Sequence, residues 1–155
     1  AIKWRRGKEL NGYLDGTQGE EVPMPAPLER APVLIVVPAS VIDNWGNELR
    51  KWGHFSFGIY AGQGREAVLD DVKSGKFEIV IIGKALFSAE KDFTALKDVS
   101  WKLIIVDEFH EYKSYATTGY KHVKELGTFN VVQRVPTIGL TGTPFQNEHR
   151  ELHSL

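Results

Sequence analysis

The sequence predicts an α/β fold in which helices cover both faces of a mostly parallel sheet. From about residue 33 onward, short apolar runs rich in β-branched residues alternate with segments of helical pattern, as in successive βαβ units. One run, residues 103–106, is apolar throughout and leads directly into Asp107 and Glu108. A continuous apolar run is typical of a parallel strand buried on both faces. Because ligands bind beyond the carboxyl ends of such strands, the two acids are predicted to lie at a ligand site.

Composition narrows the class of protein. The chain has 155 residues, 42% of them hydrophobic and 25% charged, which is typical of a globular domain with its own core. Its formal net charge is −1, so binding to nucleic acid would require a local basic patch. The absence of cysteine excludes disulfides and a thiolate zinc site. The longest apolar runs are far shorter than the roughly 18 residues of a membrane span, so no membrane partner is expected.

The chain is predicted to divide into a lead-in, residues 1–32, and a domain, residues 33–155. The lead-in ends with four closely spaced prolines. Proline fixes the backbone and lacks an N–H donor, so residues 11–32 are predicted to form a loop.

Strands and helices alternate within the predicted domain. Ser40 is the expected N-cap of the first helix, because residues 40–43 have the spacing of a capping box. Trp45 and Trp52 lie seven positions apart, which places both on one helical face and predicts core positions. The predicted strands are residues 33–37, 57–60, 79–82, 103–106 and 137–140. The predicted helices are residues 40–52, 65–73, 90–96, 118–126 and 148–155.

Two polar motifs follow predicted strands. An acid such as Asp107 can hold a magnesium ion, and a neighbour such as Glu108 can orient or deprotonate an attacking water. The same pair also fits two solvated acids at a strand end. Thr141 and Thr143 fit either a site facing those acids or a simple strand-to-turn exit, in which Gly142 permits a tight bend and Pro144 sets its direction.

Three segments resemble, in order, the motifs of the first motor lobe of Swi/Snf-type ATPases, a branch of the superfamily-two helicases. Residues 34–45, LIVVPASVIDNW, resemble that family's first DNA-contact motif. Residues 107–110, DEFH, together with Lys113, resemble its acid box. Residues 140–147, LTGTPFQN, resemble its coupling motif, with Glu151 and Leu152 following as in the family. The resemblance implies a three-layer RecA-like P-loop NTPase lobe, and the Cockayne-syndrome-B-like branch is the expected neighbour.

The resemblance also implies cofactors and residue roles. ATP and Mg²⁺ would be the cofactors, with Asp107 binding the metal through water and Glu108 activating the hydrolytic water. His110 would sense the coupling motif, although a lone hydrogen-bonded histidine is the alternative. The coupling residues Thr141, Gly142, Thr143 and Pro144 would relay the nucleotide state to the DNA-binding face.

Double-stranded DNA is the implied partner. A helix N-terminus such as that at Ser40 can bind a phosphate, and this role is compatible with N-capping. Gln146 and Asn147 would touch DNA or merely cap the last helix. The implied DNA-contact residues are Pro38, Ser40, Lys113, Gln146 and Asn147.

The sequence departs from the family at several positions. Phe109 stands where a small residue is usual, Glu111 where a basic residue is usual, and Gly83-Lys84 where the family has Thr or Ser followed by Tyr. The 155 residues contain no Gly-x-x-x-x-Gly-Lys-Ser/Thr phosphate loop. The chain is therefore expected to be a fragment, incomplete at its N-terminal side and nearly inactive by itself.

The expected function is that of part of the ATP-binding lobe of a DNA translocase. The full protein would act in the nucleus, in chromatin remodelling or DNA repair, on nucleosomes or another DNA-bound protein. The departures leave open a non-catalytic, degenerate lobe that serves as a protein- or DNA-interaction scaffold. An unrelated α/β enzyme, such as a transferase, would require all three motifs to be coincidental.

Overall fold

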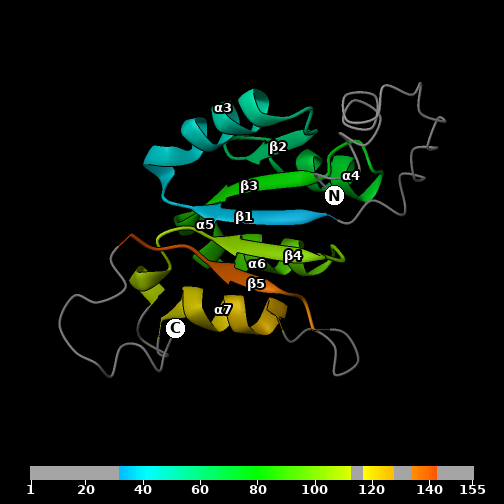
Figure 1. Ribbon diagram of the computed structural model, residues 1–155. Helices are drawn as coiled ribbons and strands as arrows, with labels where there is room; N and C mark the ends of the chain where they lie inside the picture. Colours follow the sequence, from blue (N-terminus) through cyan, green and yellow to red (C-terminus); the bar gives the residue numbers. More distant parts are fainter. Residues whose placement is uncertain (1–31, 113–116, 128–133, 143–155) are drawn as a thin grey trace.

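A computed structural model describes residues 32–112, 117–127 and 134–142, which form one layered α/β unit (Figure 1). In this part of the chain the sheet has five strands in the order β2-β3-β1-β4-β5. Every pairing is parallel, and all the arrows in Figure 1 point the same way. The strands are β1 (Val33–Val37), β2 (Phe57–Tyr60), β3 (Ile79–Gly83), β4 (Leu103–Val106) and β5 (Thr137–Gly139). The predicted α/β fold with a parallel sheet is confirmed.

Alternating residues along the strands bury two faces against different helices. Leu34 and Val36 of β1 belong to a large cluster that includes Phe87, Phe93 and Leu126. Ile35 and Val37 belong to a smaller cluster on the other face. The helices of the large cluster are α4 (Glu66–Lys73), α5 (Lys84–Ser88), α6 (Glu90–Lys97) and α7 (Thr118–Gly127). The smaller cluster is covered by α3 (Ile42–Trp52), which gives three layers.

Helix α3 begins two residues later than predicted and ends at the predicted residue, Trp52. Ser40 is not the N-cap: a 3-10 turn, η2 (Ala39–Val41), precedes the helix, and Val41 is its N-cap without a side-chain hydrogen bond. The Val41 N–H donates instead to the Pro38 carbonyl at 3.1 Å. The backbone closes this turn without the capping box.

Trp52 was predicted to be a core residue, and this is wrong. It is 60% exposed, whereas Trp45 packs against the smaller cluster. Phe55 packs into that cluster, and its ring lies 2.6 Å from where a Cβ on Gly53 would stand. The missing side chain at Gly53 therefore leaves room for the partly buried Phe55 ring just after the helix.

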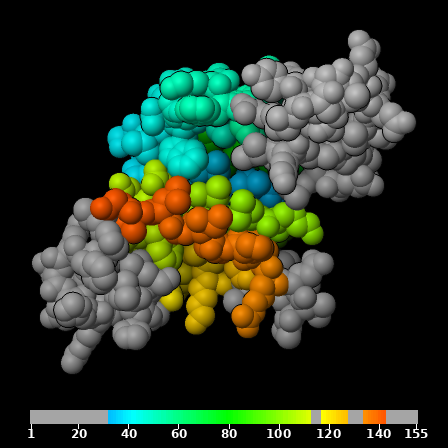
Figure 2. Space-filling model, in the orientation of Figure 1, coloured from blue at the N-terminus to red at the C-terminus, as the bar shows by residue number. Residues whose placement is uncertain are grey.

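Other differences concern the strand ends. The sequence did not predict α5, which begins directly after β3, or the 3-10 turn η3 (Phe109–Tyr112). Burial of β4 is uneven: Ile104 and Val106 are fully buried, while Leu103 and Ile105 are half-buried. All residues of β5 are exposed in the described structure, and Figure 2 shows this strand in orange at the surface.

Some predictions lie outside the described residues or are not tested by them. The lead-in up to residue 31 and the helix at residues 148–155 lie outside. The division of the chain after residue 32 stays a prediction. Within the described ranges, no helix is both long enough and apolar enough to cross a membrane.

Candidate active site

The acid turn, residues 107–112, lies where β4 ends and is tied to both neighbouring strands. The Asp107 N–H donates to the Val36 carbonyl of β1 at 2.8 Å. On the other side, the Leu140 N–H donates to the Val106 carbonyl, and the Phe109 N–H donates to the Leu140 carbonyl, both at 2.8 Å. Hydrogen bonding therefore continues past the strand ends and holds the acid turn against the segment that follows β5.

The His110 side chain lies between Glu108 and Thr141, which belongs to the segment that follows β5. Its Nδ1 is 2.9 Å from the Thr141 Oγ1 and 3.1 Å from a carboxylate oxygen of Glu108. The imidazole is 13% exposed and the Glu108 side chain 41% exposed. The structure thus brings together Glu108, His110 and Thr141, with the histidine in contact with both other side chains.

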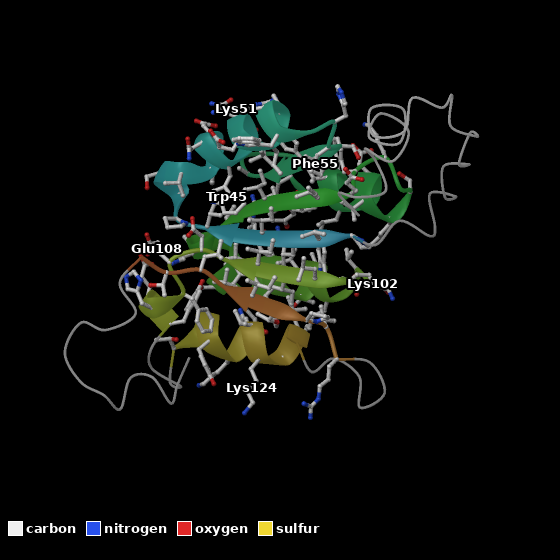
Figure 3. All side chains as sticks on the ribbon, in the orientation of Figure 1. Trp45, Lys51, Phe55, Lys102, Glu108 and Lys124 are labelled. Carbon is white, nitrogen blue, oxygen red and sulfur yellow. The ribbon has the colours of Figure 1, made fainter. Side chains whose placement is uncertain are left out.

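The Asp107 carboxylate is held by a donor at each oxygen. Oδ1 accepts the backbone N–H of Glu108 at 2.9 Å, and Oδ2 accepts the indole N–H of Trp45 at 2.9 Å. Figure 3 shows Trp45, from α3, and Glu108 both near the carboxyl ends of the strands. Paired donors of this kind fix a carboxylate's orientation, as they do for residues that hold metals.

The sequence pointed to Trp45 as a core residue and missed this second role. Its hydrogen-bond partner lies 62 positions away, so no local pattern connects the two side chains. The available signal was that a buried indole N–H usually finds a partner, and that helix α3 starts at the same sheet edge as the acid turn.

Glu108 has a backbone conformation that is unusual for a residue with a side chain. Its φ is +47°, the only positive value at a non-glycine position in the described residues. Such conformations cost on the order of 1–3 kcal/mol and are found most often at functional sites. Its carbonyl accepts hydrogen bonds from Lys84 Nζ at 2.8 Å and from the Glu111 N–H at 3.1 Å.

The Phe109 ring, which the resemblance marks as a departure, packs against the neighbouring strand. A Cβ on Gly139 would lie 2.8 Å from Phe109 Cγ, so the ring sits directly over the backbone of β5. The ring also meets Tyr112 edge-on, with centroids 6.2 Å apart. The larger side chain therefore packs in space that glycine leaves open.

The remaining predicted site residues are only partly described. Pro38 and Ser40 follow β1 at the same edge of the sheet, and Ser40 is exposed. Gly142 is also exposed. The predicted residues outside the described ranges are Lys113, Thr143, Pro144, Gln146 and Asn147.

The acids fit a magnesium ion in their donor chemistry. Mg²⁺ prefers oxygen ligands and is usually held by one or two carboxylates together with waters and phosphates. Among the residues that the structure describes, no group of three or more His, Asp or Glu side chains could hold a metal by itself. The Asp107 carboxylate therefore suits a metal that also binds waters and a phosphate.

Comparisons with known proteins identify the family of this chain. The family model of the SNF2-related domain matches residues 5–155. "Switch 2" of Arabidopsis thaliana is 31% identical over 142 residues, which cover 91% of this chain and 15% of that protein. "Protein CHROMATIN REMODELING 19" of the same plant is 35% identical over 137 residues, covering 80% of this chain and 17% of that protein.

A solved structure extends the likeness to three dimensions. The Sulfolobus solfataricus SWI2/SNF2 ATPase core in complex with double-stranded DNA has a TM-score of 0.64 and 33% sequence identity. The match covers 81% of this chain and 24% of that one. The parallel sheet is thus that of a RecA-like lobe, and the chain belongs to the SNF2-related domain family.

Proposed function

We propose that this chain is part of the ATP-binding lobe of a DNA-dependent ATPase that translocates on duplex DNA. The observation that carries the proposal is His110, whose imidazole contacts both Glu108 and Thr141 at the carboxyl edge of the sheet. Membership of the SNF2-related family supports it, as does the likeness to an ATPase core solved with double-stranded DNA. The full protein would work in the nucleus on nucleosomes or another DNA-bound protein, in chromatin remodelling or repair. Kinship with the Cockayne-syndrome-B-like branch stays a prediction.

Each acid has a distinct task in this proposal. The Asp107 carboxylate, oriented by Trp45 and by the Glu108 amide, would hold Mg²⁺ through water. When bound, the ion would neutralise charge on the ATP phosphates. The Glu108 carboxylate is accessible and would orient the attacking water and accept its proton.

Thr141 and the residues that follow it would respond to the nucleotide bound at this site. Thr141 contacts His110, and His110 contacts the Glu108 carboxylate, so a shift of that carboxylate would reach the segment after β5 through one imidazole. Gly142, Thr143 and Pro144 would carry that shift toward the DNA. The relay remains a proposal for these residues.

DNA would be bound mainly through its phosphates. Motors that track the backbone need little base readout. Pro38 and the exposed Ser40 begin the segment that continues into α3, and Trp45 of that helix contacts Asp107. We carry over DNA contacts to Lys113, Gln146 and Asn147 from the resemblance alone.

ATP hydrolysis by the full-length protein, with and without duplex DNA, tests the proposal. We expect duplex DNA to stimulate turnover, since the proposed motor couples hydrolysis to DNA binding. The isolated 155 residues should hydrolyse almost no ATP, because they lack a phosphate loop and its lysine. Full-length protein that binds DNA but hydrolyses no ATP would instead be the interaction scaffold.

A further inference from the structure

Lys84 reaches the acid turn from a different part of the sheet. It is the first residue of α5, directly after β3, and β1 separates β3 from β4. Its Nζ donates to the Glu108 carbonyl at 2.8 Å and to the Glu111 carboxylate at 2.9 Å. The ammonium also lies 5.2 Å from the centroid of the Tyr112 ring.

These contacts surround the backbone of Glu108. The Lys84 side chain is 13% exposed, so it has little contact with water and its ammonium is stabilised by these acceptors. One acceptor is the carbonyl of the residue whose φ is +47°. A charged donor on that carbonyl opposes relaxation of the turn toward negative φ, which would swing the Glu108 side chain away.

The second partner of Lys84 is a charged side chain. The Lys84 Nζ lies 2.9 Å from a carboxylate oxygen of Glu111, whose side chain is 51% exposed. The ion pair holds the ammonium beside the Glu108 carbonyl and offsets its charge.

We infer that Lys84 is a positioning residue for Glu108, acting through the Glu108 carbonyl, with Glu111 holding the ammonium in place. The inference rests on the proposed function, because it assigns Glu108 a reacting water to orient. Loss of Lys84 would displace the carboxylate while leaving the nucleotide grip intact. We therefore expect kcat to fall and the KM for ATP to stay close to that of wild type.

Lys97 offers a matched control. Its Nζ pairs with Glu125 at 3.1 Å and lies 5.2 Å from the centroid of the Phe93 ring, so it makes a similar ion pair and ring contact. The pair joins α6 to α7, away from the acid turn. Lys97→Met therefore removes the same kind of interaction without touching the Glu108 carbonyl.

The kinetic test uses full-length protein with saturating duplex DNA. We expect Lys84→Met to lower kcat for ATP about tenfold, the lower end of the range for groups that orient a site's ligands, and to change KM less than twofold. Lys84→Arg, which keeps a charged donor, should recover most of kcat, and Lys97→Met should match wild type. Glu111→Gln should cost less than threefold, because Lys84 keeps its carbonyl contact. An equal loss in Glu111→Gln and Lys84→Met would overturn the role of the carbonyl.

Amide hydrogen exchange provides a readout that needs no ATPase activity. Lys84→Met should speed exchange at the Phe109 and Glu111 amides, which hold the turn, whereas Lys97→Met should not. Unchanged exchange together with unchanged kcat would overturn the inference. Faster exchange in a protein whose wild type hydrolyses no ATP would refute the proposed function and leave the positioning role standing. If Lys84→Met does not fold, Lys84→Gln replaces it with the same expected directions.

Discussion

Two carboxylates of this chain, Glu108 and Asp92, each contact other side chains, yet their surroundings differ. Asp92 is 4% exposed, and one of its oxygens accepts hydrogen bonds from Tyr60 at 2.9 Å and Arg65 at 2.7 Å. Glu108 is accessible, lies on a backbone with positive φ, and contacts a histidine. The partners of Asp92 stabilise a buried charge. The Glu108 carboxylate instead faces solvent in a fixed direction. The comparison separates a carboxylate that stabilises the fold from one placed to react.

Ionisation near Asp92 is consistent with a structural role. Arg65 holds the pKa of Asp92 below its ordinary value through a hydrogen bond. Burial, with Asp92 as hydrogen-bond partner, raises the pKa of Tyr60 to about 12. The network therefore keeps one charge state over a wide range of pH, as a structural site should.

The largest expected effect is that of Glu108→Gln on turnover. The amide keeps the shape of the side chain but cannot take a proton from water, so kcat should fall on the order of 1,000-fold. ATP affinity and melting temperature should stay close to wild type. The measurements are single-turnover hydrolysis and nucleotide binding in the full-length protein, and turnover within tenfold of wild type would remove Glu108 from its role.

Asp92→Ala should show the opposite pattern. It leaves the buried Tyr60 hydroxyl without its acceptor, so the free energy of unfolding should fall by about 1–3 kcal/mol. The kcat of the folded protein should not change. Urea unfolding measures the first effect and ATP turnover at low temperature the second; a loss of kcat without loss of stability would break the comparison.

Trp45→Phe isolates the donor to Asp107. The phenyl ring still packs against the smaller core cluster, but Oδ2 of Asp107 loses the hydrogen bond from the indole N–H. We expect roughly a tenfold increase in the Mg²⁺ concentration needed for half-maximal turnover, the lower end of the effect of removing an orienting partner. A Mg²⁺ titration of the ATPase rate measures it, with Trp52→Phe, on the exposed end of the same helix, as the control. Equal Mg²⁺ dependence in both variants would show that the contact does not orient Asp107.

The smallest effect concerns alkaline stability. The folded protein binds the Tyr60 proton more tightly than the unfolded chain does. The contribution of this group to stability is therefore complete below pH 10 and is lost as pH rises toward 12. At pH 11 the loss from Tyr60 should be about 1 kcal/mol. Burial raises the pKa of Tyr112 to about 12 as well, so Tyr60→Phe should reduce the pH dependence of unfolding without abolishing it. If the unfolding of Tyr60→Phe had the same pH dependence as that of wild type, a group other than Tyr60 would be responsible for it.

The strands were predictable because their signal is local. Short, mostly apolar runs located the five described strands to within one residue of the observed bounds, and the parallel orientation followed from the alternation with helices. The helix α5 was missed because its five residues, Lys84–Ser88, follow β3 without an intervening turn or a side-chain cap. Its burial comes from packing of Phe87 against distant elements, which no short window reveals.

The site was predictable only in part. Asp107 and Glu108 could be placed because a strand end can be identified from the sequence. The contacts that orient them come from Trp45 and Lys84, which lie 62 and 24 positions from their partners. Contacts over such separations depend on strand order, and strand order is a property of the whole sheet.

A structure of the full-length protein with Mg²⁺ and a non-hydrolysable ATP analogue tests the central claim most directly. We predict the γ-phosphate beside the acid turn, with the metal's waters on Asp107 and a single water between the Glu108 carboxylate and the phosphorus. A nucleotide seated away from this turn, or a Glu108 side chain directed away from it, would contradict the assignment.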